Sequence, residues 1–266
     1  MSIKLTLLGT GTFFVSEKRS SSAYLLEIDE KKILIDCGPG TLMRLSQVGV
    51  DVAELDYVFI THLHADHTSD LFPLFMNYRL LDFSSEGKKT DYPKFIGPQK
   101  IAEFILQSSR NHELLAVEGW EKVRMRGVQS RENFGNIEVE SFPVSHTAFG
   151  KSAEAYAYRF TVNGKVISFS GDSIKCDGVE KVCINADLFV CDASYPKGKG
   201  NPAHMDTIDI GSIGESSQVK KIILSHFYPP TDNVNLVAEV KERFSGEVVR
   251  GEDLMSFTIE VDNIPE

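Results

Sequence analysis

The chain has 266 residues, of which 42% are hydrophobic and 25% are charged, a composition typical of an ordinary globular protein. Its net charge of −10 argues against strong nonspecific binding to nucleic acid, which depends on Lys and Arg neutralising phosphates. No apolar run is long enough to span a membrane, and the first residues lack the pattern of a signal peptide, so we expect a cytoplasmic protein without a membrane partner.

The first part of the chain alternates short apolar strands with turns. Strands are expected at residues 3–8, 23–28 and 33–36, and a helix at 41–48. Asp36 ends the third strand, where it either orients a ligand histidine or serves as a turn or helix-capping residue. A fourth apolar run, residues 57–60, predicts a buried strand.

A polar cluster follows this fourth strand directly. Residues 61–67 read Thr-His-Leu-His-Ala-Asp-His, and such a segment is poorly suited to a core because each polar group would need a partner. In extended chain, side chains at i and i+2 point the same way, so His62 and His64 can hold one ion. Past the strand end, Asp66 and His67 can face a second ion. Imidazole and carboxylate suit zinc and its borderline neighbours, so the segment predicts a metal site.

The middle of the chain carries less information about function. A helix is expected at 69–81, a polar loop at 81–92 as the rim of a pocket, a strand at 94–98 and a helix from 99 to about 112. His112, near the end of that helix, is expected on the surface. Residues 123–135 are charged and turn-rich.

The second half repeats one pattern, an apolar strand followed by a polar residue. Strands are expected at 137–142, 155–160, 166–169, 188–191, 221–225, 247–250 and 255–261, and helices from His204 to Gly214 and at 233–244. His62, His146, Asp172, Asp192 and His226 each come at the end of a strand. Loops gather and ligands bind at strand ends of an α/β sheet, so these residues are candidates for one site. No linker is evident, and one domain over residues 1–266 is the economical interpretation.

The four cysteines, Cys37, Cys176, Cys183 and Cys191, form no C-x-x-C pair. We expect reduced and mostly buried thiols.

The segment 61–67 resembles the H-x-H-x-D-H signature of the metallo-β-lactamase superfamily, and the order of His146, Asp172 and His226 is similar to the order in that superfamily. The segments Leu-Gly-Thr-Gly at 8–11 and Asp-Cys-Gly-Pro-Gly-Thr at 36–41 resemble the ribonuclease Z-like branch. So do Ser-Gly-Asp-Ser at 170–173, Ser-His-Phe at 225–227 and Ala-His-Met-Asp at 203–206. The resemblance implies an α/β fold, a four-layer αββα sandwich of two mixed β-sheets flanked by helices.

The resemblance also implies a set of site residues. One divalent metal ion would be held by His62, His64 and His146, and the second by Asp66, His67 and His226, with Asp172 bridging both. The metals would be zinc, with manganese or iron as alternatives. Asp66, His204 and Asp192 are the implied catalytic residues, with His204 donating a proton to the leaving oxygen and Asp192 fixing its tautomer. A hydroxide that bridges the metals would be the nucleophile.

One departure from the family pattern concerns substrate size. Only 26 positions separate His146 from Asp172, and bacterial ribonuclease Z proteins typically insert a long tRNA-binding arm in that interval. We therefore expect hydrolysis of phosphodiesters of modest size. The alternatives are tRNA 3′-processing, with RNA as partner, hydrolysis of a lactone, thioester or sulfate ester, and a metal-binding scaffold without turnover. A homodimer through the helix after Asp66 is a further expectation.

Overall fold

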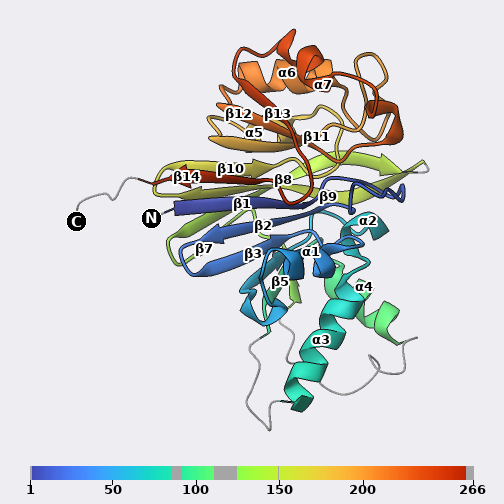
Figure 1. The fold of residues 1–266 in the computed structure, drawn as a ribbon, viewed down its shortest axis with the longest axis vertical. Helices are drawn as coiled ribbons and strands as arrows, with labels where there is room; N and C mark the ends of the chain where they lie inside the picture. Colours follow the sequence, from blue (N-terminus) through green and yellow to red (C-terminus); the bar gives the residue numbers. More distant parts are fainter. Residues whose placement is uncertain (1, 85–91, 111–124, 149, 262–266) are drawn as a thin grey trace.

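The computed structural model describes residues 2–84, 92–110, 125–148 and 150–261. Two seven-stranded sheets lie face to face at its centre (Figure 1). The first sheet has the order β14 (Ser256–Glu260), β1 (Ser2–Gly9), β2 (Ala23–Ile28), β3 (Lys31–Ile35), β4 (Tyr57–Phe59), β5 (Lys94–Gly97), β6 (Met125–Gly127). The second has the order β13 (Glu247–Arg250), β12 (Lys221–Ser225), β11 (Leu188–Asp192), β10 (Lys165–Phe169), β9 (Lys151–Val162), β8 (Ile137–Ala148), β7 (Arg131–Phe134).

Both sheets are mixed in the same way. In the first sheet the pairs from β14 to β3 are antiparallel, and the pairs β3–β4, β4–β5 and β5–β6 are parallel. In the second sheet the pairs from β7 to β10 are antiparallel, and the pairs β10–β11, β11–β12 and β12–β13 are parallel. The carboxyl ends of neighbouring parallel strands therefore meet at one edge of each sheet, where binding sites of α/β proteins form.

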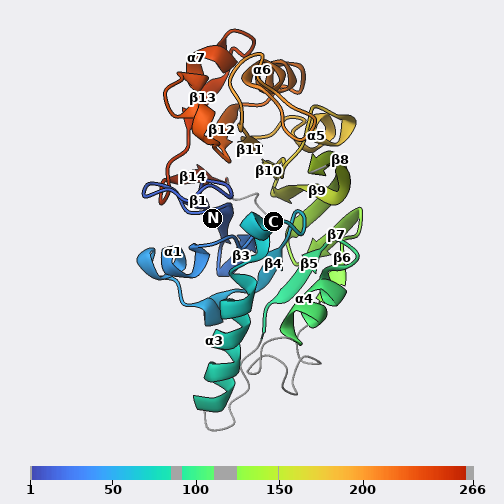
Figure 2. The same cartoon turned by 90° about the vertical axis from the view of Figure 1, so that its right-hand side faces the viewer.

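Helices cover the outer face of each sheet (Figures 1 and 2). On the first sheet lie α1 (Thr41–Gln47), α3 (Leu71–Ser84) and α4 (Ile101–Ser109), and on the second lie α5 (Asp177–Val182), α6 (Thr207–Ser216) and α7 (Leu236–Lys241). Short helices α2 (Ala65–Thr68), η1 (Val52–Glu54) and η3 (Pro229–Thr231) complete the described elements. The expected four-layer αββα sandwich is confirmed.

The alternation of side chains along each strand explains how the two sheets pack against each other and against the helices. Along β2, Leu26 and Ile28 face the core between the sheets, whereas Ala23 and Leu25 belong to the core under the helices of the first sheet. Side chains alternate along a strand, so a strand buried on both faces reads as an uninterrupted apolar run. The four cysteines are free, and all but the half-buried Cys176 are buried.

Several element predictions were wrong. His146 lies inside β8, paired with Ala153 of β9, and not at the end of a strand. The charged segment 125–134 contains two edge strands, β6 and β7, and α5 was not predicted. Helix α6 begins at Thr207 and not at His204, because the Asp206 side chain accepts hydrogen bonds from the N–H groups of Ile208 and Asp209.

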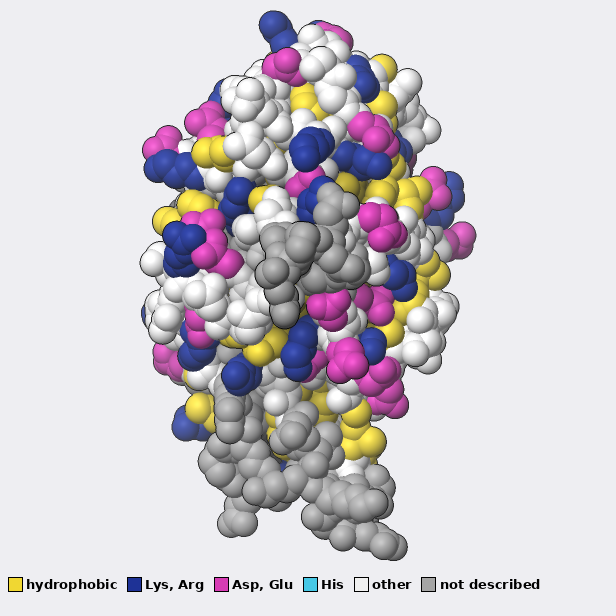
Figure 3. Space-filling model, turned by 90° about the vertical axis from the view of Figure 1, so that its left-hand side faces the viewer, with side chains coloured by type: hydrophobic (Ala, Val, Ile, Leu, Met, Phe, Trp, Pro, Cys, Tyr) yellow, Lys and Arg dark blue, Asp and Glu magenta, His cyan; other side chains and the backbone are white. Residues whose placement is uncertain are grey.

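Two predictions fall partly or wholly outside the described residues. These are the polar loop, of which 85–91 are not described, and the position of His112. Among the described helices, none combines the length and apolarity needed to cross a lipid bilayer. On the face shown in Figure 3, Lys and Arg side chains are interspersed with Asp and Glu.

Candidate metal centre

The polar segment 61–67 reaches the site by leaving the first sheet after β4. The chain passes His62 and His64 in extended form and then turns into α2, which carries Asp66 and His67. The second sheet supplies His146 from β8, Asp172 from the loop after β10 and His226 from the residue after β12. All seven predicted ligands lie together, although segments from both sheets contribute them.

The first group of candidate ligands is His62, His64, His146 and Asp172. The nitrogens His62 Nε2 and His64 Nδ1 are 3.0 Å apart, and His146 Nε2 is 3.1 Å from the same Nδ1. Burial lowers the pKa of His62 well below its usual value and also lowers that of His64. Neutral imidazoles whose nitrogens converge in this way are ready to bind a cation.

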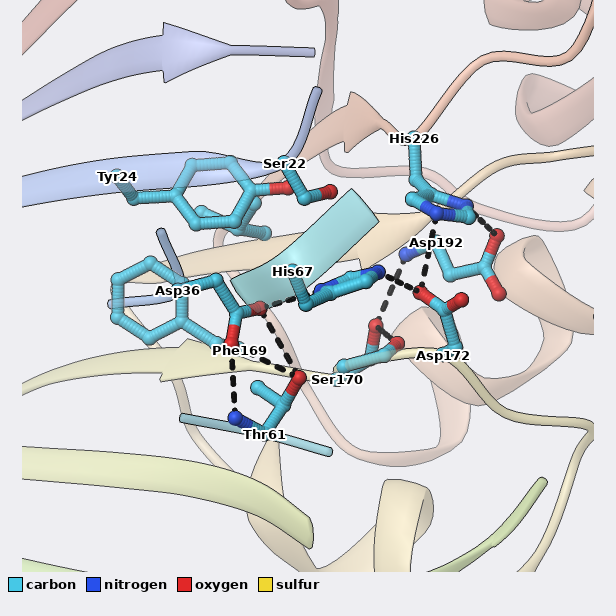
Figure 4. Close-up of a pocket in the computed structure, with 12 residues that line it drawn as sticks. Ser22, Tyr24, Asp36, Thr61, His67, Phe169, Ser170, Asp172, Asp192 and His226 are labelled. Atoms are coloured by element: carbon cyan, nitrogen blue, oxygen red, sulfur yellow. Dashed lines mark hydrogen bonds and ion pairs between the residues drawn. The ribbon is translucent and has the colours of Figure 1, made fainter. Parts of the chain in front are cut away.

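The second group is Asp66, His67, Asp172 and His226. Asp172 Oδ1 lies 3.3 Å from both His67 Nε2 and His226 Nε2, whereas its Oδ2 lies 3.7 Å from His62 Nε2 of the first group. Figure 4 shows His67 and His226 converging on this carboxylate. One carboxylate thus offers an oxygen to each group, which is the geometry of a bridging ligand.

The pKa values of the second group follow from the close approach of its buried imidazoles and carboxylates. Burial opposes protonation of His226, but Asp172, Asp192 and Asp66 outweigh it and raise its pKa to about 10. His67 behaves likewise, since burial is outweighed by Asp172 and Asp36 and its pKa is well above normal. For Asp172, burial is outweighed by His226 and His67, and its pKa is well below normal. The carboxylates of this group therefore strongly favour positive charge beside them.

Buried atoms without partners test whether a metal fits. Within the described part of the chain, Asp66 Oδ1 and His67 Nε2 are buried and make no hydrogen bond. Such groups are rare in folded proteins, because losing water without a replacement partner is costly. Both atoms belong to the second group. A divalent cation would satisfy them, so the residues fit two metal ions.

In the described segments, the far side of four of the five candidate imidazoles, all but that of His64, has a hydrogen-bond partner, as is typical of metal-bound histidine. His67 Nδ1 donates to Asp36 Oδ2 at 2.7 Å, and His146 Nδ1 donates to the Ala203 carbonyl at 3.0 Å. The Thr61 hydroxyl donates to Asp36 (Figure 4). It also lies 3.1 Å from His62 Nδ1, which places the proton of that ring on Nδ1. Of the two roles weighed for Asp36, the structure shows the contact with a candidate ligand histidine, His67.

Ser194 does for His226 what Thr61 does for His62. Its hydroxyl donates to Asp192 Oδ1 and accepts from His226 Nδ1 at 2.9 Å. His226 Nε2 is thereby left facing Asp66 and Asp172. Sequence reasoning gave no role to Thr61 or Ser194. The only signal was the position of each hydroxyl beside a strand-end histidine or carboxylate.

His204 lies beside both groups. Its ring centroid is 5.3 Å from that of His146 and 5.4 Å from that of His226, and its Nδ1 donates to Asp192 Oδ2 at 2.7 Å. Burial opposes protonation of His204, but Asp192 outweighs it and raises its pKa. The predicted pair of His204 and Asp192 is thus brought together, with Nε2 on the side of the ring opposite Asp192.

One family model and several known proteins match nearly the whole chain. The family model described as Anti-Pycsar protein Apyc1 matches residues 3–251. Rv1339, an uncharacterized protein of Mycobacterium tuberculosis, is 26% identical over 260 residues, which cover 93% of this chain and 89% of that protein.

Two solved structures share the fold. The metallo-β-lactamase fold protein YhfI of Bacillus subtilis has a TM-score of 0.80 at 22% identity, covering 97% of this chain and 100% of that one. The short form of human tRNase Z has a TM-score of 0.73 at 22% identity, covering 98% and 100%. The predicted metallo-β-lactamase fold is confirmed, and so is the predicted resemblance of this fold to that of ribonuclease Z.

Proposed function

The chain belongs to the Anti-Pycsar protein Apyc1 family, and from this membership and the paired histidine–carboxylate groups we propose that it is a dinuclear metal-dependent hydrolase that cleaves phosphodiester bonds. The observation that supports the proposal best is the position of Asp172, which faces both groups while His204 lies beside them. The namesake of the family is described as acting against Pycsar. A role of that kind for this chain would be exerted through the proposed hydrolysis.

The proposed ligand set divides between the two ions. His62, His64 and His146 would hold one, Asp66, His67 and His226 the other, and Asp172 would bridge them. Two divalent cations at this site would supply Lewis acidity that activates water and neutralises charge on the phosphate. Five imidazoles and two carboxylates suit zinc, and manganese and iron accept the same donors.

The chain's own residues complete the reaction. Water adds to phosphorus, the bond to one ester oxygen breaks, and the products are a phosphomonoester and an alcohol. His204 gives its Nε2 proton to the departing oxygen, and Asp192 holds the opposite proton on Nδ1, so the ring keeps the correct orientation. Asp66 shares the second group with His226, to which its Oδ2 is 3.4 Å away.

His204→Ala should slow phosphodiester cleavage by about two to four orders of magnitude, because the leaving oxygen loses its proton donor. Initial rates on a dialkyl phosphodiester, whose alkoxide leaving group needs a proton, measure this together with metal content by elemental analysis. Metal content should stay near that of the wild type. Lys220→Ala, which removes an exposed ion pair with Asp187, is the control and should keep the wild-type rate. Equal rates in wild type and His204→Ala would remove His204 from the reaction.

A second candidate is tRNA 3′-processing, which the likeness to human tRNase Z favours. Against it, the described residues between His146 and Asp172 form only the end of β8, β9 and β10. A 3′-extended tRNA precursor and a small lactone assayed beside the phosphodiester separate the alternatives. Cleavage at the acceptor stem would favour the endonuclease, and lactone turnover alone would favour an ester hydrolase.

Three further expectations stay predictions. These are a single domain, a cytoplasmic location and a homodimer formed through the helix after Asp66. The side chain of Leu80 on α3 is 59% exposed, and that of Met43 on α1 is 56% exposed. Both apolar side chains would be available to a second copy.

A further inference from the structure

A cavity lies beside the metal centre. It has a volume of about 320 Å³, and ligand pockets of proteins usually begin near that size. Phe13, Phe14 and Val15 form part of its wall, and the loop before α1 and the start of α2 form another part. Asp66 lines this cavity and also belongs to the second group of candidate ligands. The cavity therefore borders the metal centre at Asp66.

The wall of this cavity exposes an unusual amount of apolar surface. Phe13 is 49% exposed, Phe14 is 55% exposed and Val15 is fully exposed. Single exposed apolar residues are common, but three in succession beside a cavity form a patch of the kind that binds ligands. Covering these rings with a flat apolar group would remove that surface from water.

The loop that carries the rings is held at both ends. Asp253 accepts hydrogen bonds from the N–H and hydroxyl of Thr10 and from the N–H of Ser20, and it pairs with Arg44. Arg19 pairs with Asp232 at 2.7 Å. A wall fixed in this way loses little conformational freedom when a ligand binds, so binding is strengthened.

The positions of His204 and of the cavity decide which part of a substrate would enter. The Phe13 ring is 6.2 Å from that of His64, and the Phe14 ring is 5.5 Å from that of Tyr228. Tyr228 separates this wall from His204, which does not line the cavity. In the proposed reaction the departing oxygen would lie toward His204, so the substituent that stays on phosphorus would lie toward Asp66 and the cavity.

We infer that this cavity binds a flat aromatic or heteroaromatic substituent, the one that remains attached to phosphorus, against Phe13 and Phe14. The inference rests on the proposed phosphodiesterase activity and adds the class of substituent and the side of the metal centre on which it sits. Hydroxyl groups of Ser16, Ser20 and Ser69 along the cavity offer hydrogen bonds to polar atoms at the edge of such a ring.

Two substrates that share a leaving group can measure the contribution of the cavity to substrate binding. Bis(p-nitrophenyl) phosphate and methyl p-nitrophenyl phosphate both release p-nitrophenolate, and they differ only in the group that stays on phosphorus. The quantity measured is the ratio of their kcat/KM values. Phe13→Ala and Phe14→Ala should each lower that ratio, and the double variant should lower it by about tenfold, the usual effect of removing an aromatic stacking partner.

The control is Ile184→Ala, which removes an apolar side chain of similar exposure, 45%, at the end of α5. It should keep the wild-type ratio and both wild-type rates. Turnover of both substrates with an unchanged ratio in the double variant would overturn the inference and leave the phosphodiesterase proposal standing. Absence of turnover of either substrate by the metal-loaded wild type would instead overturn the proposed function.

Discussion

At the scale of single residues, hydrogen bonds behind the candidate ligands set the orientation of the imidazoles. Asp36 is buried and accepts from the Thr61 N–H, the Thr61 hydroxyl and His67 Nδ1. Through Thr61 it also fixes the ring of His62. The Asp36 carboxylate therefore orients one histidine in each of the two groups of candidate ligands. Asp192 likewise orients His204, and Ser194 orients His226.

Asp36→Asn should lower metal affinity by about 10- to 100-fold, the usual effect of losing a partner behind a metal ligand. Asparagine offers one acceptor oxygen where the carboxylate offers two. Titration with a fluorescent metal chelator as competitor measures the change. Asp70→Asn is the matched control, since Asp70 accepts from the N–H groups of Gly40 and Leu42 at the start of α1. It should leave metal affinity as in the wild type, and an equal loss in both variants would contradict the role of Asp36.

Much of the site was predictable at this scale, because ligand chemistry depends on residue type and spacing. The segment 61–67 contains four of the candidate ligands directly after one strand, and the remaining candidates are single residues that follow apolar runs. The hydroxyls of Thr61 and Ser194 were not predictable as functional, since a hydroxyl gains its role only from the tertiary contacts it makes.

At the scale of elements, close packing of backbone segments holds the ligand-bearing loops in place. Gly38 lies between β3 and α1, and a Cβ added there would be 2.0 Å from the Asp66 carbonyl oxygen. The Cys37 N–H also donates to the His67 carbonyl at 2.8 Å. The turn after β3 therefore supports α2 directly, and only glycine leaves room for that approach.

Gly38→Ala should destabilise the fold by about 1–3 kcal/mol through overpacking and should displace α2, with loss of metal affinity. Urea unfolding and metal titration measure the two effects. Gly49→Ala provides a comparison, because its φ of +76° also disfavours alanine but no atom lies within 4 Å of the added Cβ. That variant should lose about 1–2 kcal/mol of stability and keep its metal affinity. Full metal affinity in Gly38→Ala would contradict the coupling.

The errors of element prediction have separate physical causes. Strand β7 carries charged residues because it is an edge strand, and its Arg131 pairs across the ladder with Glu138 of β8. Helix α5 has only six residues, too few for a periodic pattern to stand out. His146 interrupts no pairing, because β8 and β9 continue together past it. The predicted bounds of the central strands, which are buried on both faces, agree closely with the observed bounds.

At the scale of the whole molecule, the metal centre joins the two halves of the sandwich. His62, His64, Asp66 and His67 follow the first sheet, whereas His146, Asp172 and His226 come from the second. The interior between the sheets is apolar, and the ligands close it at the end where the parallel strands finish. Bound metal would therefore crosslink both sheets in the folded state alone.

Removal of metal with a chelator should consequently lower the thermal midpoint. A ligand present at about 100 times its Kd stabilises the folded state by about 2.7 kcal/mol per site. For a chain of this size, each kcal/mol shifts the midpoint by about 2–4 °C, so a loss of roughly 5–10 °C is expected for each site that loses its metal. Calorimetry with and without EDTA, followed by addition of zinc, measures it. An identical midpoint in both states would argue against metal held between the sheets.

The distance along the chain between the ligands also governs the order of events during translation. His226 follows Asp66 by 160 residues, so at about 5–20 residues per second a ribosome supplies it roughly 8–32 s later. Asp253, which anchors the loop carrying Phe13 and Phe14, is made later still. A nascent chain therefore lacks a complete candidate site for most of its synthesis. The proposed activity would begin only when synthesis of the last strands is nearly finished.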